Sequence, residues 1–209
     1  MKKKVLWPVL AAGFLFLCCM VFFQNQRTVR PAVPQKISML LRRIDRSKIY
    51  PPFLEQISLL LSNCLATDAV YVATEGYRSA EDQARMHAIG RGPQTQERII
   101  TNARPFESYH NFGLAVDMVR DINLEDWGVQ PGWKREDYET VAQESRKLNL
   151  ESGYYFENFN PEGDGAADAS HVQFPLPEGV TLEDLKAWYL EEGLKGVWHE
   201  LDARRAVSK

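Results

Sequence analysis

The residue types best suited to chemistry in this chain are concentrated in two short stretches. In the first, His110 stands seven residues before Asp117, and in the second, His171 follows Asp168 by three residues. Imidazole nitrogens and carboxylate oxygens bind divalent ions such as zinc, and a hydrolytic zinc site keeps one position open for water. Two histidines, an aspartate and a further acid therefore predict a metal-activated water with a general base beside it.

The element that must position Asp117 is predicted to be a strand from Gly113 to Val119. Successive side chains of a strand point to opposite faces of the sheet. One face carries two very small residues and the acid, namely Gly113, Ala115 and Asp117. The other face is apolar, with Leu114, Val116 and Met118. We expect the apolar face to pack on helices, which leaves room beside Asp117 for an ion and a substrate.

The pattern Ser-x-His-x-x-Gly-x-Ala-x-Asp of Ser108–Asp117, followed by the Asp-x-x-His that ends at His171, resembles the motifs of zinc peptidases that cut bacterial cell-wall peptides. The upstream run Glu75–Ser79, with Gln83 after it, resembles a further segment of the same family. That group includes L-alanyl-D-glutamate endopeptidases, D-alanyl-D-alanine carboxypeptidases and dipeptidases. The resemblance covers roughly Tyr71–Phe174, with the motifs in the family's order.

The resemblance implies one Zn²⁺ per chain, held by His110, Asp117 and His171. It also implies that Asp168 is the general base, which takes the proton of the attacking water and returns it to the leaving amine. Arg78 would stabilise the oxyanion, because a guanidinium always stays charged. The implied fold is that of the hedgehog-like DD-peptidases. The alternation of helices and short strands independently predicts an α+β domain with a small, mostly antiparallel sheet flanked by helices.

Several points stay open at the level of sequence. Glu162 or Asp164 could replace Asp168 as the base, and Ser108 either caps a turn or contacts the substrate. Relatives carry proline where this chain has Ser170, and they have tryptophans in the preceding loop; these departures concern substrate specificity more than metal binding. In the family that this chain resembles, the D-alanyl-D-alanine enzymes more often have glutamate three residues before the last histidine, so the resemblance of Asp168 favours the L-Ala-D-Glu bond of the peptidoglycan stem peptide. The alternatives are a D-Ala-D-Ala carboxypeptidase or dipeptidase and a non-catalytic zinc-containing binding module.

The N-terminus has the pattern of a membrane anchor or signal segment, assigned to residues 1–24. Lys2–Lys4 precede nineteen uncharged residues, Val5–Phe23. About 20 apolar residues span a bilayer as a helix, and the basic start favours a cytoplasmic N-terminus and an exported domain. We therefore expect a domain anchored to the cytoplasmic membrane and facing the periplasm or cell wall. A cleaved signal, which would release the protein, and a lipid anchor at Cys18 or Cys19 remain alternatives.

Residues 25–50 are predicted to form a spacer and the first helix, Lys36–Lys48, and residues 51–205 the zinc peptidase domain. The apolar residues of the first helix recur at helical spacing. The loop 91–107 is polar apart from a patch, Ile99 and Ile100, that we expect to be buried. The other expected elements are helices over Pro51–Ala66, Ser79–Ile89, Glu136–Leu148 and Leu182–Ala203, strands over Val70–Thr74 and Ser170–Phe174, and a strand edge at Tyr154–Phe156.

Composition excludes some other classes. The net charge of −3 argues against a nucleic-acid surface. Outside the apolar segment Cys64 is the only cysteine, so the domain has no internal disulfide, and we expect this thiol to be a small buried apolar group. The sequence has no phosphate-binding P-loop, no dinucleotide-binding glycine motif and no Gly-x-Ser-x-Gly elbow.

Overall fold

A computed structural model describes residues 35–92, 97, 99–121, 131–132, 134–156 and 168–207. The predicted anchor, and the alternative bases Glu162 and Asp164, lie outside the described residues. Within the described part of the chain, no helix is long and apolar enough to span a membrane.

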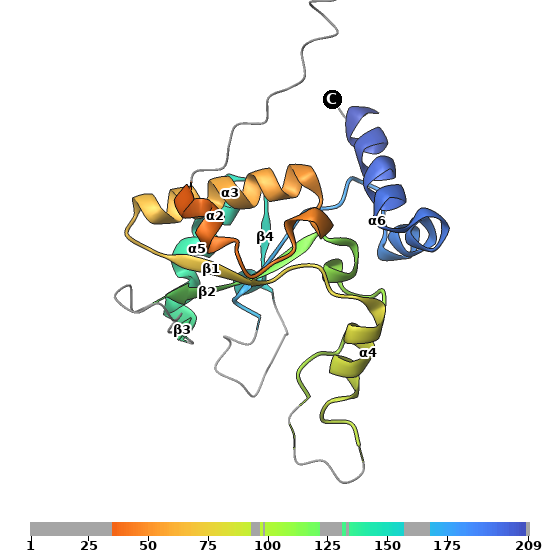
Figure 1. The fold of residues 1–209 in the computed structure, drawn as a ribbon, viewed down its shortest axis with the longest axis horizontal. Coiled ribbons are helices and arrows are strands. Elements are labelled where there is room, and N and C mark those ends of the chain that lie inside the picture. The colour runs from red at the N-terminus through yellow and green to blue at the C-terminus, as the bar shows by residue number, and fades with distance from the viewer. Residues whose placement is uncertain are drawn as a thin grey trace, which may run out of the picture. The chain divides into compact units, whose positions relative to one another are not determined.

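The helices and strands alternate along the chain (Figure 1). The α-helices are α2 (Gln35–Leu40), α3 (Pro51–Ala66), α4 (Ala80–Ala88), α5 (Glu139–Lys147) and α6 (Leu182–Val207). Short 3-10 turns are η1 (Arg46–Lys48), η2 (Tyr109–Phe112), η3 (Arg135–Tyr138) and η4 (Gly153–Tyr155). The strands are β1 (Tyr71–Glu75), β2 (Ala115–Asp121), β3 (Pro131–Gly132), β4 (Glu151–Ser152) and β5 (His171–Gln173).

The strands form one sheet in the order β1-β2-β5-β4, with β3 also paired to β2. Every pairing is antiparallel. In the central strand β2, Asp117 lies opposite His171 on one side and opposite Glu75 on the other. The predicted α+β class with a small antiparallel sheet is confirmed, and the register brings the two chemical stretches of the sequence together.

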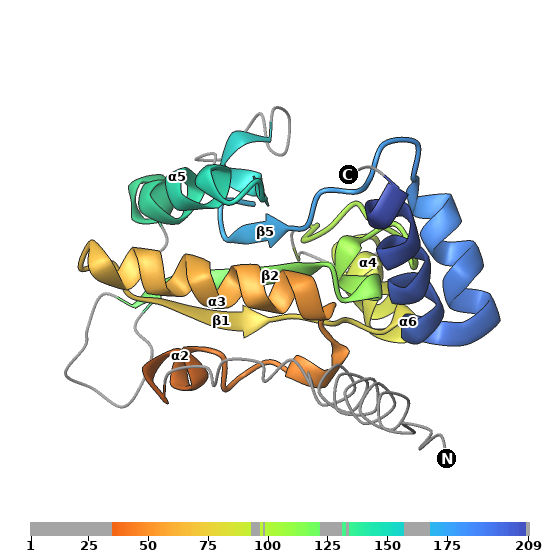
Figure 2. The same ribbon diagram turned by 90° about the horizontal axis from the view of Figure 1, so that it is seen from above.

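Helices cover the apolar face of the sheet. α3 packs against both α2 and α5, and Figure 1 shows α2 and α3 on the opposite side of the strands from α4. Leu114, just before β2, and the β2 side chains Val116 and Met118 are fully buried in this core, as their alternation predicts. α6 contacts η2 at one end of the sheet, which Figure 2 shows from above. The polar face of β2 is thus left for the site.

The predicted helix over Lys36–Lys48 is wrong in extent, because the α-helix ends at Leu40. Asp45 instead caps η1, since its carboxylate accepts the Ser47 amide at 3.1 Å and the Ser47 hydroxyl at 2.6 Å. Such local bonds compete with helix continuation. The apolar residues of the segment nevertheless belong to the core, as Ile37 (2% exposed) and Leu41 (0%) show.

The strand predicted from Gly113 begins later in the structure, because β2 starts at Ala115 and Gly113 lies outside it. Its φ of +68° places it in the left-handed region, where it ends η2, and a Cβ here would overlap the carbonyl oxygen of Lys48. Glycine is therefore required for both conformation and space. The predicted strand edge at Tyr154–Phe156 is also wrong, because Ser152 caps the 3-10 turn η4. Ile99 and Ile100 are each 46% exposed, so the patch expected to be buried lies at the surface.

The start of α4, the break in α6 and the burial of Cys64 agree with the sequence signals. Ser79 caps α4, accepting the Asp82 amide on its side-chain oxygen at 3.0 Å. α6 is interrupted at Gly193, whose backbone is not helical, so the predicted weak point divides it into two helical segments. Cys64 is buried, as expected.

Candidate metal centre and its pocket

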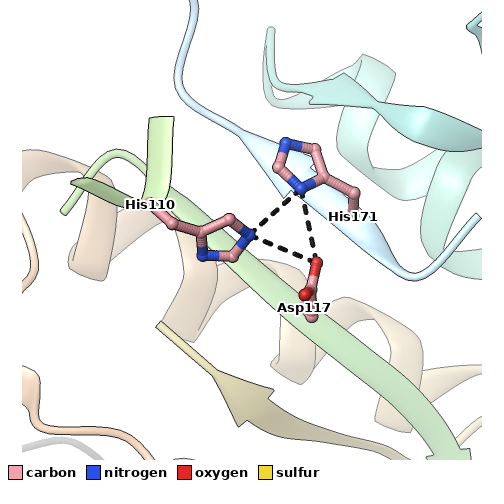
Figure 3. A group of neighbouring side chains, drawn as sticks. All are labelled: His110, Asp117 and His171. Carbon is pink, nitrogen blue, oxygen red and sulfur yellow. Dashed lines mark hydrogen bonds and ion pairs between the residues drawn. The ribbon is translucent and has the colours of Figure 1, made fainter. Parts of the chain in front are cut away.

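Three predicted ligands from three elements converge on one point. His110 comes from η2, Asp117 from β2 and His171 from β5. Asp117 Oδ1 lies 3.4 Å from His110 Nε2 and 3.3 Å from His171 Nδ1. The two ring nitrogens are 3.3 Å apart, and all candidate ligand atoms lie within 4.8 Å of one another (Figure 3). Two imidazoles and one carboxylate form a donor set that fits zinc.

The remaining nitrogen of each ring points away from this triangle in Figure 3 and has its own partner. His110 Nδ1 is 2.6 Å from the carbonyl oxygen of Gly76. Because a carbonyl only accepts, Nδ1 carries the proton, and Nε2 of the neutral ring keeps its lone pair for a metal. His171 Nε2 lies 2.8 Å from Gln173 Oε1, and a proton on Nε2 of the neutral ring would leave the Nδ1 lone pair to a metal in the same way. Both inward nitrogens are therefore set to act as ligands.

The two histidines keep the Asp117 carboxylate negatively charged. Burial by itself would raise the pKa of Asp117, but the charges and hydrogen bonds of His110 and His171 outweigh it and hold the pKa well below its usual range. Burial likewise opposes the charged form of His171, yet the hydrogen bond and charge of Asp117 raise its pKa. The carboxylate is thus ionised, as a ligand must be.

Asp168 lies one turn before β5 and lines the same pocket as the ligands. Its backbone carbonyl accepts the His171 amide at 2.9 Å, which ties the acid to the ligand strand. Burial raises the pKa of Asp168, and the nearby Asp117 charge adds to this, although the histidines oppose it. A carboxyl group with a raised pKa beside the metal ligands can both accept and donate a proton. The structure therefore brings the predicted base to the centre.

Arg78 is buried in the pocket wall, only 8% exposed. Its Nε donates to Glu75 Oε1 at 2.6 Å, and its Nη1 donates to Gln83 Oε1 at 2.8 Å. Nη2 lies 3.9 Å from Asp117 Oδ2. Gln83, fully buried, also donates to the carbonyl oxygen of Ala103 at 2.7 Å. The guanidinium is fixed on two edges, and its third nitrogen is directed toward the metal centre.

Ser108 combines the two roles that the sequence left open. Its side-chain oxygen accepts the His110 amide at 3.4 Å and caps η2, and it also lines the pocket. A contact with substrate is therefore sterically available to Ser108.

The pocket has a volume of about 340 Å³. Its polar lining includes Arg78, Ser108, Asp168 and the three candidate ligands together with Glu75, Glu107 and Gln173, and its apolar lining includes Met86, Ile100 and Phe156. The Phe156 ring is 41% exposed, and its centroid lies 6.1 Å from that of His171. The pocket thus joins the polar groups of the candidate metal centre to exposed apolar side chains.

Sequence reasoning assigned no role to Glu75, Gln173 or Glu151. Glu75 stands in the same motif as Arg78, and Gln173 shares a strand face with His171, so local spacing could have identified both. Glu151 comes from β4 and reaches Gln173 only through strand pairing. No local pattern indicates that contact.

Sequence similarity links this chain to a known family. Residues 46–174 match the family described as VanY, D-alanyl-D-alanine carboxypeptidase. The peptidoglycan L-alanyl-D-glutamate endopeptidase CwlK of Bacillus subtilis (strain 168) is 34% identical over 95 residues, which cover 42% of this chain and 54% of CwlK. The matched region thus spans about half the length of this curated relative.

Two solved structures are similar at a greater distance. The L-Ala D-Glu endopeptidase ChiX of Serratia marcescens is 24% identical, with a TM-score of 0.41 over 62% of this chain and 82% of ChiX. The D,D-pentapeptidase VanY of a VanB-type vancomycin resistance cassette, solved with Zn(II), is 18% identical, with a TM-score of 0.45 over 71% of this chain and 83% of that chain.

The family match extends over more than half of the chain. It contains all three candidate ligands of the metal centre and both predicted catalytic residues, Arg78 and Asp168. The chain belongs to the VanY D-alanyl-D-alanine carboxypeptidase family.

Proposed function

We propose that this protein is a zinc-dependent peptidase that hydrolyses a stem-peptide bond of peptidoglycan, and that the bond joins L-Ala to D-Glu. One observation carries the proposal. The donor atoms of His110, Asp117 and His171 converge in a pocket whose wall also contains Asp168 and Arg78.

Each residue of the proposed site has a defined task. His110 Nε2, Asp117 Oδ1 and His171 Nδ1 would hold the ion, which when bound supplies Lewis acidity that polarises a carbonyl and lowers the pKa of water. Asp168 removes a proton from the attacking water and then delivers it to the nitrogen of the leaving amine. The scissile C–N bond breaks, a new carboxylate forms on one product, and a new amine forms on the other.

Arg78 stabilises the negative charge that develops on the scissile carbonyl oxygen. Its side chain needs little reorganisation during the reaction, because Glu75 and Gln83 already fix Nε and Nη1. Pre-oriented charge of this kind is among the largest contributions to catalysis. Removing an oxyanion donor lowers turnover by roughly 10²–10³-fold in well-studied cases.

Two observations support the L-Ala-D-Glu bond. The identity of 34% is with an L-alanyl-D-glutamate endopeptidase, and the acid that precedes His171 by three residues is an aspartate. The second candidate is D-Ala-D-Ala carboxypeptidase action, which the family description favours. A non-catalytic zinc-containing binding module is disfavoured, because such a module needs neither Asp168 nor Arg78 in the pocket.

We also propose that the N-terminal segment anchors the domain to the cytoplasmic membrane, facing the periplasm or cell wall. The support comes from sequence alone: Lys2–Lys4 followed by the uncharged run Val5–Phe23. Such an enzyme would act on peptidoglycan within reach of its tether. A cleaved signal would give a secreted enzyme with the same chemistry.

The activity is tested by digesting purified peptidoglycan with the full-length protein in detergent and identifying the products by mass. We expect fragments with a new D-Glu amino terminus, which disappear on treatment with a chelator and return when zinc is added. Release of free D-alanine instead would establish carboxypeptidase action. Binding without any cleavage by the zinc-loaded protein would identify a binding module and contradict the proposal.

A further inference from the structure

A continuous set of hydrogen bonds connects the metal centre to the surface strand β4. His171 Nε2 lies 2.8 Å from Gln173 Oε1, and Gln173 Nε2 donates to Glu151 Oε2 at 2.6 Å. Glu151 and Gln173 are Cα partners in the pairing of β4 with β5, and Gln173 lies two residues after His171 on the same strand. The sheet register therefore places the three side chains next to one another.

The donor and acceptor identities along this set are not interchangeable. An ionised carboxylate only accepts hydrogen bonds, so Glu151 requires the NH₂ group of the Gln173 amide. The amide oxygen is then the group that faces His171, and it also only accepts. His171 must consequently donate from Nε2. In the neutral ring the lone pair is then on Nδ1, the nitrogen that faces Asp117 and His110.

The second histidine ligand is oriented differently. His110 Nδ1 faces the backbone carbonyl of Gly76, an acceptor that no side-chain substitution removes. His171 depends on a side-chain amide, which would accept equally well if it were turned around. Gln173 is only 8% exposed, whereas Glu151 lies at the surface. The direction of the buried amide is thus decided by a carboxylate that solvent can reach.

We propose that Glu151, acting through Gln173, selects the tautomer of His171 that binds the metal. Gln173 and Glu151 are positioning residues: neither is a predicted ligand, and both act through His171. This inference rests on the proposed metal centre. Partners of this kind typically change metal affinity by roughly 10–100-fold when they are replaced.

Glu151→Lys tests the inference by replacing the acceptor at the surface end of the hydrogen-bond chain with a donor. An ammonium only donates, so the Gln173 amide would turn its oxygen to position 151 and its NH₂ group to His171. His171 would then accept at Nε2 and carry its proton on Nδ1. We expect zinc affinity to fall by roughly 10–100-fold, measured by competition with a chelator on the full-length protein.

The double replacement Gln173→Glu with Glu151→Gln is the matched rescue. A carboxylate at position 173 still accepts from His171 Nε2, and an amide at position 151 donates to it. Zinc affinity should therefore stay close to that of the wild type. Glu178→Lys, at an exposed turn outside the pocket lining, controls for the change in charge.

The tautomer itself is read in the metal-free protein from the ¹⁵N chemical shifts of the His171 ring, at a pH where the ring is neutral. Without the ion, Asp117 Oδ1 also accepts from Nδ1, so we expect a larger share of rings protonated on Nε2 in the wild type and in the double variant than in Glu151→Lys. Equal shares of the two tautomers in the wild type and Glu151→Lys would overturn the inference even if zinc affinity fell. If the wild type bound no zinc, the proposed function would fail, while the ring shifts would still decide the tautomer.

Discussion

Asp168 and His171 belong to one short turn and strand, yet their side chains have opposite requirements. His171 must present an unprotonated nitrogen to the ion, and its outward nitrogen is engaged by Gln173. Asp168 must exchange a proton, and burial raises its pKa above the ordinary carboxyl value. Different partners around these neighbouring residues thus suit His171 to the proposed role of ligand and Asp168 to the proposed role of base.

The role of Asp168 predicts that Asp168→Asn keeps the metal but loses most turnover. The amide has nearly the same size, and it cannot take a proton from water. General-base catalysis contributes roughly 10²–10⁴-fold, so we expect a loss of this order in stem-peptide cleavage with zinc content unchanged. Asp68→Asn is the matched control, because Asp68 is exposed at a φ of +57°, a conformation that asparagine tolerates.

Other outcomes would reassign the base. Loss of zinc from Asp168→Asn would make Asp168 a ligand. Near-normal turnover would exclude it as the base and direct attention to Glu162 or Asp164.

At the residue scale, the sequence predicts those parts of the site that local motifs contain. His110 and Asp117 share one motif, and Asp168 and His171 share another, so their types and spacing are visible without a structure. Glu151 could not be predicted, because its contact with Gln173 depends on the pairing of β4 with β5. Local spacing carries no information on such a long-range bond.

At the scale of elements, strand prediction succeeds where alternation is long enough to recognise. β2 has seven residues, and its apolar face is buried as expected. β4 has two residues and η4 has three, so neither shows a period. Ser152 then decides between strand and turn by capping η4, where it accepts the Tyr154 amide at 3.3 Å. Short elements therefore depend on individual hydrogen bonds.

η4 positions Asp168 through a close approach at Gly153. A Cβ on Gly153 would overlap the carbonyl oxygen of Asp168 and lie 3.0 Å from its Cγ. Gly153→Ala should therefore displace Asp168 and reduce turnover. We also expect a stability loss of about 1–3 kcal/mol, the usual range for overpacking a buried site, measured by denaturant unfolding.

Gly179→Ala separates the two effects. Gly179 has open space for a Cβ, but its φ of +77° strains any other residue, at a cost of about 1–2 kcal/mol. The control should lose stability and retain turnover. Equal activity losses in both variants would show that the Gly153 effect is only a loss of stability.

At the scale of the whole molecule, the α+β class follows from the alternation of elements, whereas the strand order does not. The order β1-β2-β5-β4 places the last strand of the chain between two earlier ones, which brings Asp117 opposite His171. Their separation in sequence gives no indication of this contact. The motifs indicate that the residues act together, and the topology explains how they meet.

The proposed anchor predicts that protease added to intact spheroplasts digests the domain and leaves a small membrane-bound stub. The reason is that an uncharged run the length of Val5–Phe23 can cross a bilayer, with Lys2–Lys4 retained inside. Immunoblotting for tags at the two ends of the chain follows both products. A cytoplasmic protein that stays intact until the spheroplasts are lysed is the control.

Two results would contradict the anchor. A soluble mature protein that begins after Phe23 would show that the segment is a cleaved signal. Protection of the domain in intact spheroplasts would place it in the cytoplasm, out of reach of the proposed substrate.

The central claim is that His110, Asp117 and His171 hold a zinc ion, and metal analysis of purified variants tests it most directly. Three protein ligands with one open position bind about one zinc ion per chain. We predict this stoichiometry for the wild type and for His199→Ala, a control on the exposed surface of α6. We predict no stoichiometric zinc in His110→Ala or His171→Ala. Unchanged zinc in both ligand variants would contradict the account.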